Sequence, residues 1–355
     1  GMLIVKFGYK KTALLALIVG IIGMVLELLS GTLESMWIYL LGAFIAGFCM
    51  CMLNTVVNPL LNVLGGGGNT GNQLIQIGCA FNSAAAVAVY IILGALIGEV
   101  TKDTAIVDAA PAMYIALGIF VAAFIVLFFT KIEEPKQEPV KAELIKGALS
   151  HRHFALGALA IFLYMSVEVG TPTYMIKYLI SDVGISAGVA SLIAAVYWFA
   201  MFIGRSIGGS IGGKVSSRAM VSTVAIAAII LLAFGMLAPS TLTVQVPGVD
   251  WANLSVIWVD VPVGVAAFIC VGLCTSVMWG GIFNMAVEGL GKYTAAASGI
   301  FMTMVFGCAI MVALQAVVAE QTGSYLVSYI IPLACAAYIL FYALVGSRVK
   351  KTEAE

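Results

Sequence analysis

Residues 54–83 read NTVVNPLLNVLGGGGNTGNQLIQIGCAFNS, a segment that holds six Asn and two Gln between apolar runs. Asn54, Asn58 and Asn62 are spaced four residues apart, so on a helix they form one polar stripe. The glycines at 65–68 predict a turn, after which a second amide-bearing helix begins. Buried amides need hydrogen-bonding partners, and one candidate partner for this dense set is a polar solute.

The composition of the whole chain identifies an integral membrane protein. Of the 355 residues, 62% are hydrophobic and only 10% are charged, and the mean hydropathy is +1.11. Soluble domains carry about 25% charged residues, so this chain has too few for a water-exposed surface. The formal net charge of zero gives no indication of a nucleic-acid partner.

Ten apolar runs approach or exceed the length of a membrane-spanning helix, which is about 20 residues. They cover residues 12–30, 37–62, 74–99, 112–130, 154–179, 185–211, 219–237, 262–286, 294–318 and 325–346. Because the number of crossings is even, both chain ends are expected on the same side of the membrane.

The distribution of basic residues predicts which side this is. They concentrate near both chain ends and in the connections expected on the same side, at Lys6, Lys10, Lys11, Lys136, Lys141, Lys146, Lys214, Arg218, Lys292, Arg348, Lys350 and Lys351. The other side has Lys102 and, near a helix end, Lys177. The positive-inside rule therefore places both termini in the cytoplasm.

The charged loop at 131–152 is the predicted boundary between two helix bundles. Four of the predicted helices lie in an N-terminal bundle at 1–130, and six lie in a C-terminal bundle at 153–348. Residues 349–355 form a short cytoplasmic tail. This division of four and six helices is unequal for a transporter built from repeats.

Two connections carry further information. Residues 238–261 include the alternating TLTVQV, which predicts a small β-hairpin on the outer side, and Asn253-Leu-Ser there fits a glycosylation acceptor. Residues 1–11 and 209–218 both place cations after glycine and align as inner turns. Two helices precede the second turn within its bundle and none precedes the first, so two helices are expected upstream of Gly1.

Several motifs that suggest ligand sites have simpler explanations. Residues 208–214 match a phosphate-binding loop, but Val215 follows where Ser or Thr is needed, and a helix precedes the motif where a strand is needed. The same segment instead gives a small-residue helix face for close packing, formed by Gly204, Gly208 and Gly212. His151 and His153 lie in a polar loop and are predicted to be solvated. Neither a disulfide nor a metal site is expected from the cysteines, which are predicted to be small buried side chains, at Cys49, Cys51, Cys79, Cys270, Cys274, Cys308 and Cys335.

Glu168 is the only carboxylate deep within a predicted span. A charge near the bilayer centre costs about 3 kcal/mol or more, so Glu168 either contacts a substrate or relays a proton, or forms an ion pair within the bundle. The TPT sequence at 171–173 should bend the same helix. The WGG sequence at 279–281 interrupts the span at 262–286, and an aromatic ring beside bare backbone suits a sugar. Ordinary packing is the alternative explanation for Trp279.

The remaining intramembrane amides of the second bundle are Asn284 and Gln315. Each of them either lines a site or makes a hydrogen bond between helices, which is worth about 1 kcal/mol.

Several motifs together resemble a known family. They are NP at 58–59, FNS at 81–83, YMSVEV at 164–169, YW at 197–198, GR at 204–205, and GLGKYT at 289–294 with Gly299. In this order they resemble the major facilitator superfamily, and within it the fucose permease-like branch of sugar:cation symporters, which includes glucose/galactose permeases. The resemblance covers essentially the whole chain as helices 3–12 of a twelve-helix, all-α membrane fold.

The chain departs from the pattern of that branch at several positions. Val5 stands where an Asp is usual, Asn54 where the branch has Glu, Cys79 where it has Gln, and Gly280 where it has Pro. The first helix of the pattern, which carries an acid implicated in proton coupling, is absent. Because Asn54 cannot carry a proton, coupling is left to an acid on that helix or to Na⁺.

The resemblance implies a secondary transporter in the cell (inner) membrane that imports a monosaccharide of the fucose, glucose or galactose type. The coupled ion would be H⁺ or Na⁺, transport would proceed by alternating access, and the protein would be a monomer in the lipid bilayer, without cofactor, metal or enzymatic activity. The expected substrate-binding residues are Asn54, Asn58, Gln76, Asn82, Glu168, Trp279, Asn284 and Gln315. Two alternatives are a facilitator for a non-sugar solute such as a drug, and a non-transporting fragment that lacks a complete site.

Overall fold

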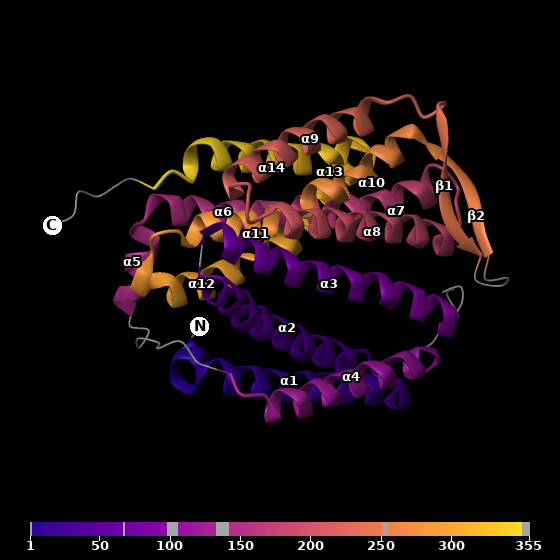
Figure 1. Ribbon diagram of the computed structural model, residues 1–355. Coiled ribbons are helices and arrows are strands. Elements are labelled where there is room, and N and C mark those ends of the chain that lie inside the picture. Colours follow the sequence, from indigo (N-terminus) through magenta and orange to yellow (C-terminus); the bar gives the residue numbers. More distant parts are fainter. Residues whose placement is uncertain (1, 67, 98–105, 133–141, 251–254, 350–355) are drawn as a thin grey trace.

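A computed structural model describes residues 2–66, 68–97, 106–132, 142–250 and 255–349 of the chain. Most of the long helices run in roughly the same direction across the molecule (Figure 1). The first and last residues that the structure describes, 2 and 349, lie with α5 (Ala142–Ser150) at one end of the molecule, which we call the terminal end. A β-hairpin lies at the opposite end, which we call the hairpin end.

The first part of the chain forms four long helices. These are α1 (Met2–Leu33), α2 (Met36–Leu64), α3 (Gly68–Ile97) and α4 (Ala110–Phe129), with a 3-10 turn η1 (Ile106–Ala109) before α4. In Figure 1, α1, α2 and α4 form the lower layer, and α3 lies between α2 and α8. The turn between α2 and α3 occurs at the predicted glycines, where Gly66 and Gly68 have φ values of 72° and 55° that only glycine adopts readily.

The second part forms a larger bundle. Its helices are α5, α6 (Arg152–Met165), α7 (Thr171–Ser181), α8 (Ala187–Ile211), α9 (Ser217–Leu237), α10 (Val263–Thr275), α11 (Met278–Val287), α12 (Thr294–Met304), α13 (Gly307–Thr322) and α14 (Ile330–Phe341). Its shorter helical segments are η2 (Ser166–Gly170), η3 (Gly291–Tyr293), η4 (Val327–Tyr329) and η5 (Tyr342–Gly346). Large aromatic side chains such as Tyr164, Tyr174 and Tyr197 are fully buried in the core of this bundle.

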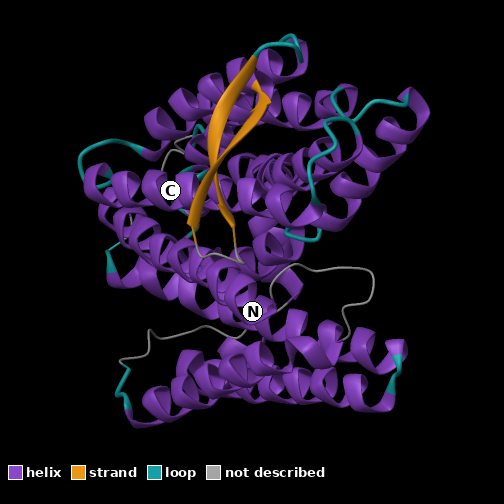
Figure 2. Ribbon diagram, turned by 90° about the vertical axis from the view of Figure 1, so that its right-hand side faces the viewer, coloured by secondary structure: helices purple, strands orange, loops and turns teal. Residues whose placement is uncertain are grey.

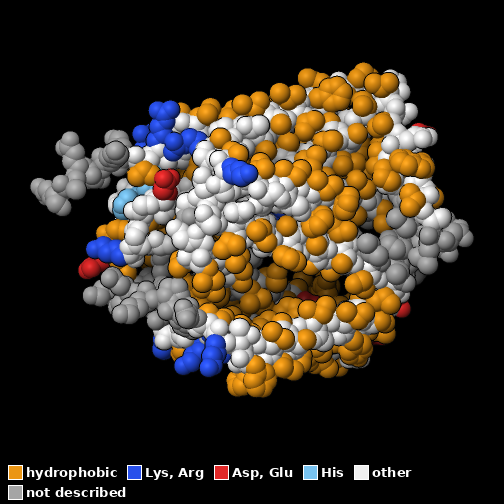
Figure 3. All heavy atoms as spheres, in the orientation of Figure 1, with side chains coloured by type: hydrophobic (Ala, Val, Ile, Leu, Met, Phe, Trp, Pro, Cys, Tyr) orange, Lys and Arg blue, Asp and Glu red, His pale blue; other side chains and the backbone are white. Residues whose placement is uncertain are grey.

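Within the described residues, nine stretches are long and apolar enough to cross a membrane. They correspond to nine of the ten predicted spans. The tenth predicted span, at 74–99, overlaps α3 but is not among the nine, and its last two residues fall outside the described ranges. Many large apolar side chains are exposed, including Phe44 at 74% and Phe129 at 77%, and they cover much of the surface in Figure 3. Such a surface suits contact with lipid chains.

The predicted hairpin is confirmed. Strands β1 (Thr243–Asp250) and β2 (Ser255–Pro262) pair antiparallel, with Thr243 opposite Pro262 and Asp250 opposite Ser255. Figure 2 looks onto the hairpin end and shows the two strands as a twisted ribbon in front of the helix ends. Val246 and Val261 of the hairpin are buried in the core of the second bundle. The glycosylation acceptor Asn253 lies outside the described residues.

Some connections differ from the prediction. Residues 2–11, expected as an inner turn, are helical apart from a kink at Gly8, whose φ of 81° breaks the helical path. The expected loop at 131–152 contains helix α5, because its apolar residues recur at helical spacing. The interruption of the span at 262–286 falls at 276–277, just before Trp279, which is itself helical. Glycines at 280–281 did not break this helix because they pack against neighbouring side chains.

The small-residue face of α8 packs as predicted. A Cβ atom added to Gly204 would meet the side chain of Ser276 and lie 2.9 Å from the carbonyl oxygen of Leu273, and one added to Gly208 would meet Val277. All three of these contacted residues lie in or just after α10. The glycines therefore let α8 approach the break between α10 and α11 closely.

We expect Gly204→Ala to destabilise the protein by about 1–3 kcal/mol, because a backbone carbonyl cannot move aside as a side-chain tip can. Gly118→Ala in α4 is the matched control, since no atom lies within 4 Å of a Cβ at that position. The measurement is the thermal unfolding midpoint in detergent. Equal midpoints for the two variants would contradict the close packing of α8.

Candidate functional site

A cavity of about 370 Å³ lies between α2 and α3 on one side and helices of the second bundle on the other. We call it the central cavity. Its polar or aromatic lining comes from Asn54, Asn58, Asn82, Glu168, Arg205 and Trp279. Figure 3 shows the surface hollowed between the lower helix layer and the rest of the molecule. The structure thus gathers five of the eight predicted site residues around one cavity.

The first-bundle wall of the cavity supplies amides. Asn58 is buried, and its Nδ2 donates a hydrogen bond to the backbone oxygen of Asn54 over 3.0 Å. Asn54 and Asn82 are exposed to the cavity. Among the described residues, the side-chain amides of Asn54 and Asn82 and Oδ1 of Asn58 have no hydrogen-bond partner in the protein. These groups are therefore available to donate to and accept from a solute.

The opposite wall is built on an irregular helix. Ser166–Gly170 is a π-helical segment between α6 and α7, and it carries Glu168. Pro172 has no N–H group, so the carbonyl oxygen of Glu168, four residues earlier, loses its usual helical donor. The hydroxyl of Tyr197 donates to that oxygen over 3.0 Å. The proline and the tyrosine together explain why the helix is distorted where Glu168 faces the cavity.

Glu168 forms a buried ion pair with Arg205 of α8. Nη2 of Arg205 lies 3.1 Å from Oε1 of Glu168, and the two side chains are only 6% and 11% exposed. Nη1 of Arg205 donates to Oγ of Ser83 over 2.6 Å and to the Cys79 carbonyl oxygen over 3.1 Å, both on α3. Nε donates to the Ser276 carbonyl oxygen over 3.4 Å. Arg205 thus joins α3 to three segments of the second bundle at the cavity wall.

Trp279 presents an aromatic surface to the cavity from α11. Its ring stacks on Phe283 with centroids 5.7 Å apart and meets the edge of Phe301 at 5.9 Å. Phe283 and Phe301 are fully buried, whereas Trp279 is only partly buried. The two phenylalanines hold the indole in place, and its accessible part lines the cavity.

Three predicted site residues lie away from the central cavity. Nε2 of the buried Gln76 donates to the Val277 carbonyl oxygen over 3.0 Å, and Nε2 of the buried Gln315 donates to Oγ of Ser328 over 3.3 Å. Asn284 forms hydrogen bonds with Asn62 and Ser217, which lie on two other helices. In this structure these amides connect helices, which is the alternative that the sequence left open for Asn284 and Gln315.

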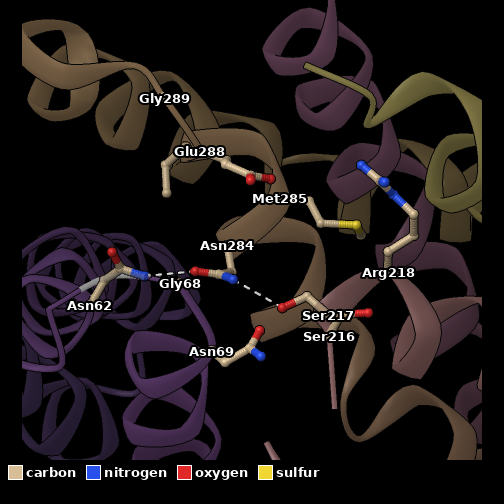
Figure 4. Close-up of a pocket in the computed structure, with 11 residues that line it drawn as sticks. Asn62, Gly68, Asn69, Ser216, Ser217, Arg218, Asn284, Met285, Glu288 and Gly289 are labelled. Atoms are coloured by element: carbon tan, nitrogen blue, oxygen red, sulfur yellow. Dashed lines mark hydrogen bonds between the residues drawn. The ribbon is translucent and has the colours of Figure 1, made fainter. Parts of the chain in front are cut away.

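A second cavity of about 340 Å³ lies at the terminal end and is shown in Figure 4. Nδ2 of Asn62 donates to Oδ1 of Asn284 over 3.0 Å, and Nδ2 of Asn284 donates to Oγ of Ser217 over 2.9 Å. This chain of hydrogen bonds joins α2, α11 and the first residue of α9. We call it the Asn62–Asn284–Ser217 chain. Asn69, Arg218 and Glu288 contribute further polar groups to the same cavity, the last two from the second bundle.

Arg205 was not among the site residues that the sequence predicted. The structure pairs it with Glu168. The available signal was that an isolated carboxylate and an isolated guanidinium in an apolar chain each need an opposite charge.

Two other expectations about side chains were wrong. His153 is 5% exposed, and its Nε2 lies 2.9 Å from the Glu288 carbonyl oxygen. It is buried because α6 already begins at Arg152, which turns His153 towards the core. The cysteines are all free, but Cys51 and Cys270 are exposed instead of buried, and Cys79 and Cys308 are only partly buried. In an apolar environment exposure costs a thiol little, so the small side chain tolerates either position.

Comparisons with known proteins agree with this architecture. The model of the Major Facilitator Superfamily matches residues 1–314. A glucose/galactose transporter from Brucella abortus biovar 1 (strain 9-941) is 27% identical, over 98% of this chain and 81% of its own length. The L-fucose-proton symporter of Escherichia coli (strain K12) is 21% identical, over 97% of this chain and 80% of its own. The crystal structure of FucP in the outward conformation superposes with a TM-score of 0.80 at 21% identity, covering 98% of this chain and 86% of that one.

Proposed function

Because the chain belongs to the major facilitator superfamily, whose members are membrane transporters and not enzymes, we propose that it carries a monosaccharide across the membrane together with a cation. The substrate is a neutral hexose or deoxyhexose of the glucose, galactose or fucose type. The cation is H⁺ or Na⁺. Transport proceeds by alternating access of the central cavity to the two sides.

The observation that carries this proposal is the lining of the central cavity. It offers an aromatic face at Trp279 and, from the other bundle, polar groups without a partner among the described residues, namely the side-chain amides of Asn54 and Asn82 and Oδ1 of Asn58. A sugar has an apolar ring face that stacks on indole and a rim of hydroxyls that bond to amides. The volume of about 370 Å³ is within the range of about 300–1,000 Å³ for small-molecule sites.

The names of the relatives support the same substrate class. One is called a glucose/galactose transporter and another an L-fucose-proton symporter. Both names specify a monosaccharide, and they differ in which one. The identity of 27% or less supports the class of solute and leaves the particular sugar to experiment.

We further propose that the terminal end faces the cytoplasm of a cell (inner) membrane. Most of the Lys and Arg side chains visible in Figure 3 gather at this end, as the positive-inside rule requires of a cytoplasmic face. Residues 1–130 and 153–348 would form the two bundles that rock about the cavity. We also propose that the protein imports its substrate and acts as a monomer.

The test is uptake by the purified protein in proteoliposomes. Radiolabelled glucose, galactose and fucose are each offered with no gradient, with an inward proton gradient, and with an inward Na⁺ gradient. We expect saturable uptake of at least one sugar, accelerated by one of the two gradients. No saturable uptake of any of the three under all three conditions would reject the sugar proposal. An apolar drug that is transported instead would support the alternative of a non-sugar facilitator.

We expect Trp279→Ala to raise the KM for sugar by roughly tenfold or more, because loss of an aromatic stacking face costs about 1–3 kcal/mol. Trp279→Phe, which keeps a smaller ring, should have a milder effect. Trp258→Ala is the control, since this tryptophan lies on the hairpin and is 64% exposed. Equal KM values for Trp279→Ala and the unmodified protein would show that the indole is only a packing residue.

A further inference from the structure

The charges on the wall of the central cavity cancel. Among the described residues that line it, Glu168 and Arg205 are the only charged ones, and they are paired. The other lining residues are amides, apolar side chains, an indole and a free thiol. A solute in the cavity therefore meets a polar but electrically neutral wall.

The positive half of the pair is fixed in place and in charge. A guanidinium does not lose its proton in a protein. Arg205 is also held by four hydrogen bonds, to Ser83, Cys79, Ser276 and Glu168. Because three of these partners are not Glu168, the guanidinium would stay at the cavity wall even if the carboxylate moved away.

The negative half is held less completely. Only Oε1 of Glu168 contacts Arg205, and the carboxylate reaches the cavity wall from the distorted π-helical segment. A carboxylate has about four acceptor positions, so acceptor capacity is left for a solute hydroxyl. If Glu168 were neutralised, the fixed charge of Arg205 would be buried without compensation, which is strongly unfavourable. Glu168 is therefore required as an anion for as long as Arg205 occupies this position.

We propose that the Glu168–Arg205 pair is a charge filter, which holds the cavity neutral so that uncharged sugars are selected over sugar acids and amino sugars of the same shape. This inference rests on the proposed sugar-transport function and adds the basis of its selectivity. A neutral sugar enters by exchanging hydrogen bonds with water for hydrogen bonds with the wall. A carboxylate or ammonium group must give up ionic hydration and finds no unpaired opposite charge in return.

The filter makes a prediction that other roles of Glu168 do not share. If Glu168 carried the coupled proton, its loss would abolish coupling whether or not Arg205 were present. If the pair acts through its zero net charge, removing both charges together should preserve the preference for neutral over charged sugars, whatever the change in absolute affinity. Removing one charge should instead admit a solute of the opposite sign to the charge that remains.

The experiment measures competition against the labelled sugar that the unmodified protein binds, in detergent, at pH 7. The competitors are unlabelled glucose, glucuronate and glucosamine, which are neutral, anionic and cationic. The variants are Glu168→Gln, Arg205→Gln and the double variant E168Q/R205Q, and each is assayed only if it elutes as a single species. Lys177→Gln is the control for a change of net charge, because Lys177 is exposed and lies outside the central cavity.

We expect glucuronate to gain about tenfold or more relative to glucose in Glu168→Gln, and glucosamine to gain likewise in Arg205→Gln. The double variant should keep the preference of the unmodified protein for glucose, and Lys177→Gln should not differ from it. Unchanged selectivity in a folded single variant would overturn the filter, as would a preference for glucuronate or glucosamine over glucose in a folded double variant. If neither single variant folds, the preference of the double variant among the three competitors alone tests the filter. If the unmodified protein binds no sugar, the proposed function fails and not the filter.

Discussion

In the Arg205→Leu variant we expect sugar uptake to fall by at least about 100-fold and the free energy of unfolding to fall by about 3–5 kcal/mol. A loss of about 3–5 kcal/mol in stability is typical when one partner of a buried ion pair is removed and the other charge is left uncompensated. Glu168 would then lie among buried groups without its counter-ion. The measurements are initial uptake rates in proteoliposomes and the thermal unfolding midpoint in detergent.

The loss of stability should lie towards the upper end of this range because Arg205 also connects helices. Without the guanidinium, Oγ of Ser83 and the carbonyl oxygens of Cys79 and Ser276 each lose a donor. Unpaired buried acceptors cost about 1–3 kcal/mol each, more than the net gain from making the bonds. The variant therefore weakens the contact between α3 and α8 as well as the cavity wall.

Two comparisons separate these effects. Lys177→Leu removes an exposed cation and should leave the unfolding midpoint nearly unchanged. Adding Glu168→Gln to Arg205→Leu removes the uncompensated charge and should recover part of the lost stability. An unfolding midpoint for Arg205→Leu as high as that of the unmodified protein would show that the pair contributes nothing to the folded state.

In the Asn284→Leu variant we expect the terminal end to open more often. Asn284 is the middle member of the Asn62–Asn284–Ser217 chain, which links α2 to α11 and α9 across the terminal-end cavity. A net loss of about 1–1.5 kcal/mol of hydrogen bonding shifts a two-state equilibrium about tenfold. The readout is the rate at which a maleimide labels Val287→Cys, a buried position that lines the same cavity, quantified by mass spectrometry of that peptide.

Gln315→Leu is the matched control. It also removes a buried amide, but its partner Ser328 belongs to the same bundle. We expect maleimide labelling at position 287 to rise about tenfold with Asn284→Leu and to stay unchanged with Gln315→Leu. Equal rates in both variants would mean that the Asn62–Asn284–Ser217 chain does not hold the terminal end closed.

The sequence allowed good prediction of the elements because each follows from a local rule. Long apolar runs predicted the spans, alternation at 238–261 predicted the hairpin, and glycine spacing predicted the packed face of α8. The exact position of the helix break near Trp279 could not be predicted from such a rule. Glycine is tolerated within a helix when neighbouring helices pack against it, and those neighbours are not visible in the sequence.

The asparagine stripe shows why the site was predicted only in part. Four residues advance about 400° around an α-helix, so each step of four turns the side chain by about 40° and raises it by about 6 Å. Over the two steps from Asn54 to Asn62 the stripe therefore rotates by about 80°. Asn54 and Asn58 reach the central cavity, whereas Asn62 reaches the one at the terminal end.

Tertiary contacts decided the remaining cases. Gln76 and Gln315 are as polar as the cavity asparagines, and in an apolar chain either kind of residue needs a partner. Whether that partner is a solute or another helix depends on whether helix packing turns the residue towards the cavity or towards a neighbouring helix. Glu168 and Arg205 pair through the packing of three helices and the π-helical segment, which no local pattern of residues encodes.

The π-helical segment at 166–170 also constrains how this helix can change in length. A π turn holds one residue more than an α turn, so deleting one residue there would convert it to a regular turn. Glu168 would then lose its place at the cavity wall, while Tyr174 and Tyr178 could keep their buried positions in α7. The segment behaves as a one-residue insertion confined to a single turn. An ordinary core helix could therefore gain a charge facing a cavity through one inserted codon, with the packing on both sides of it preserved.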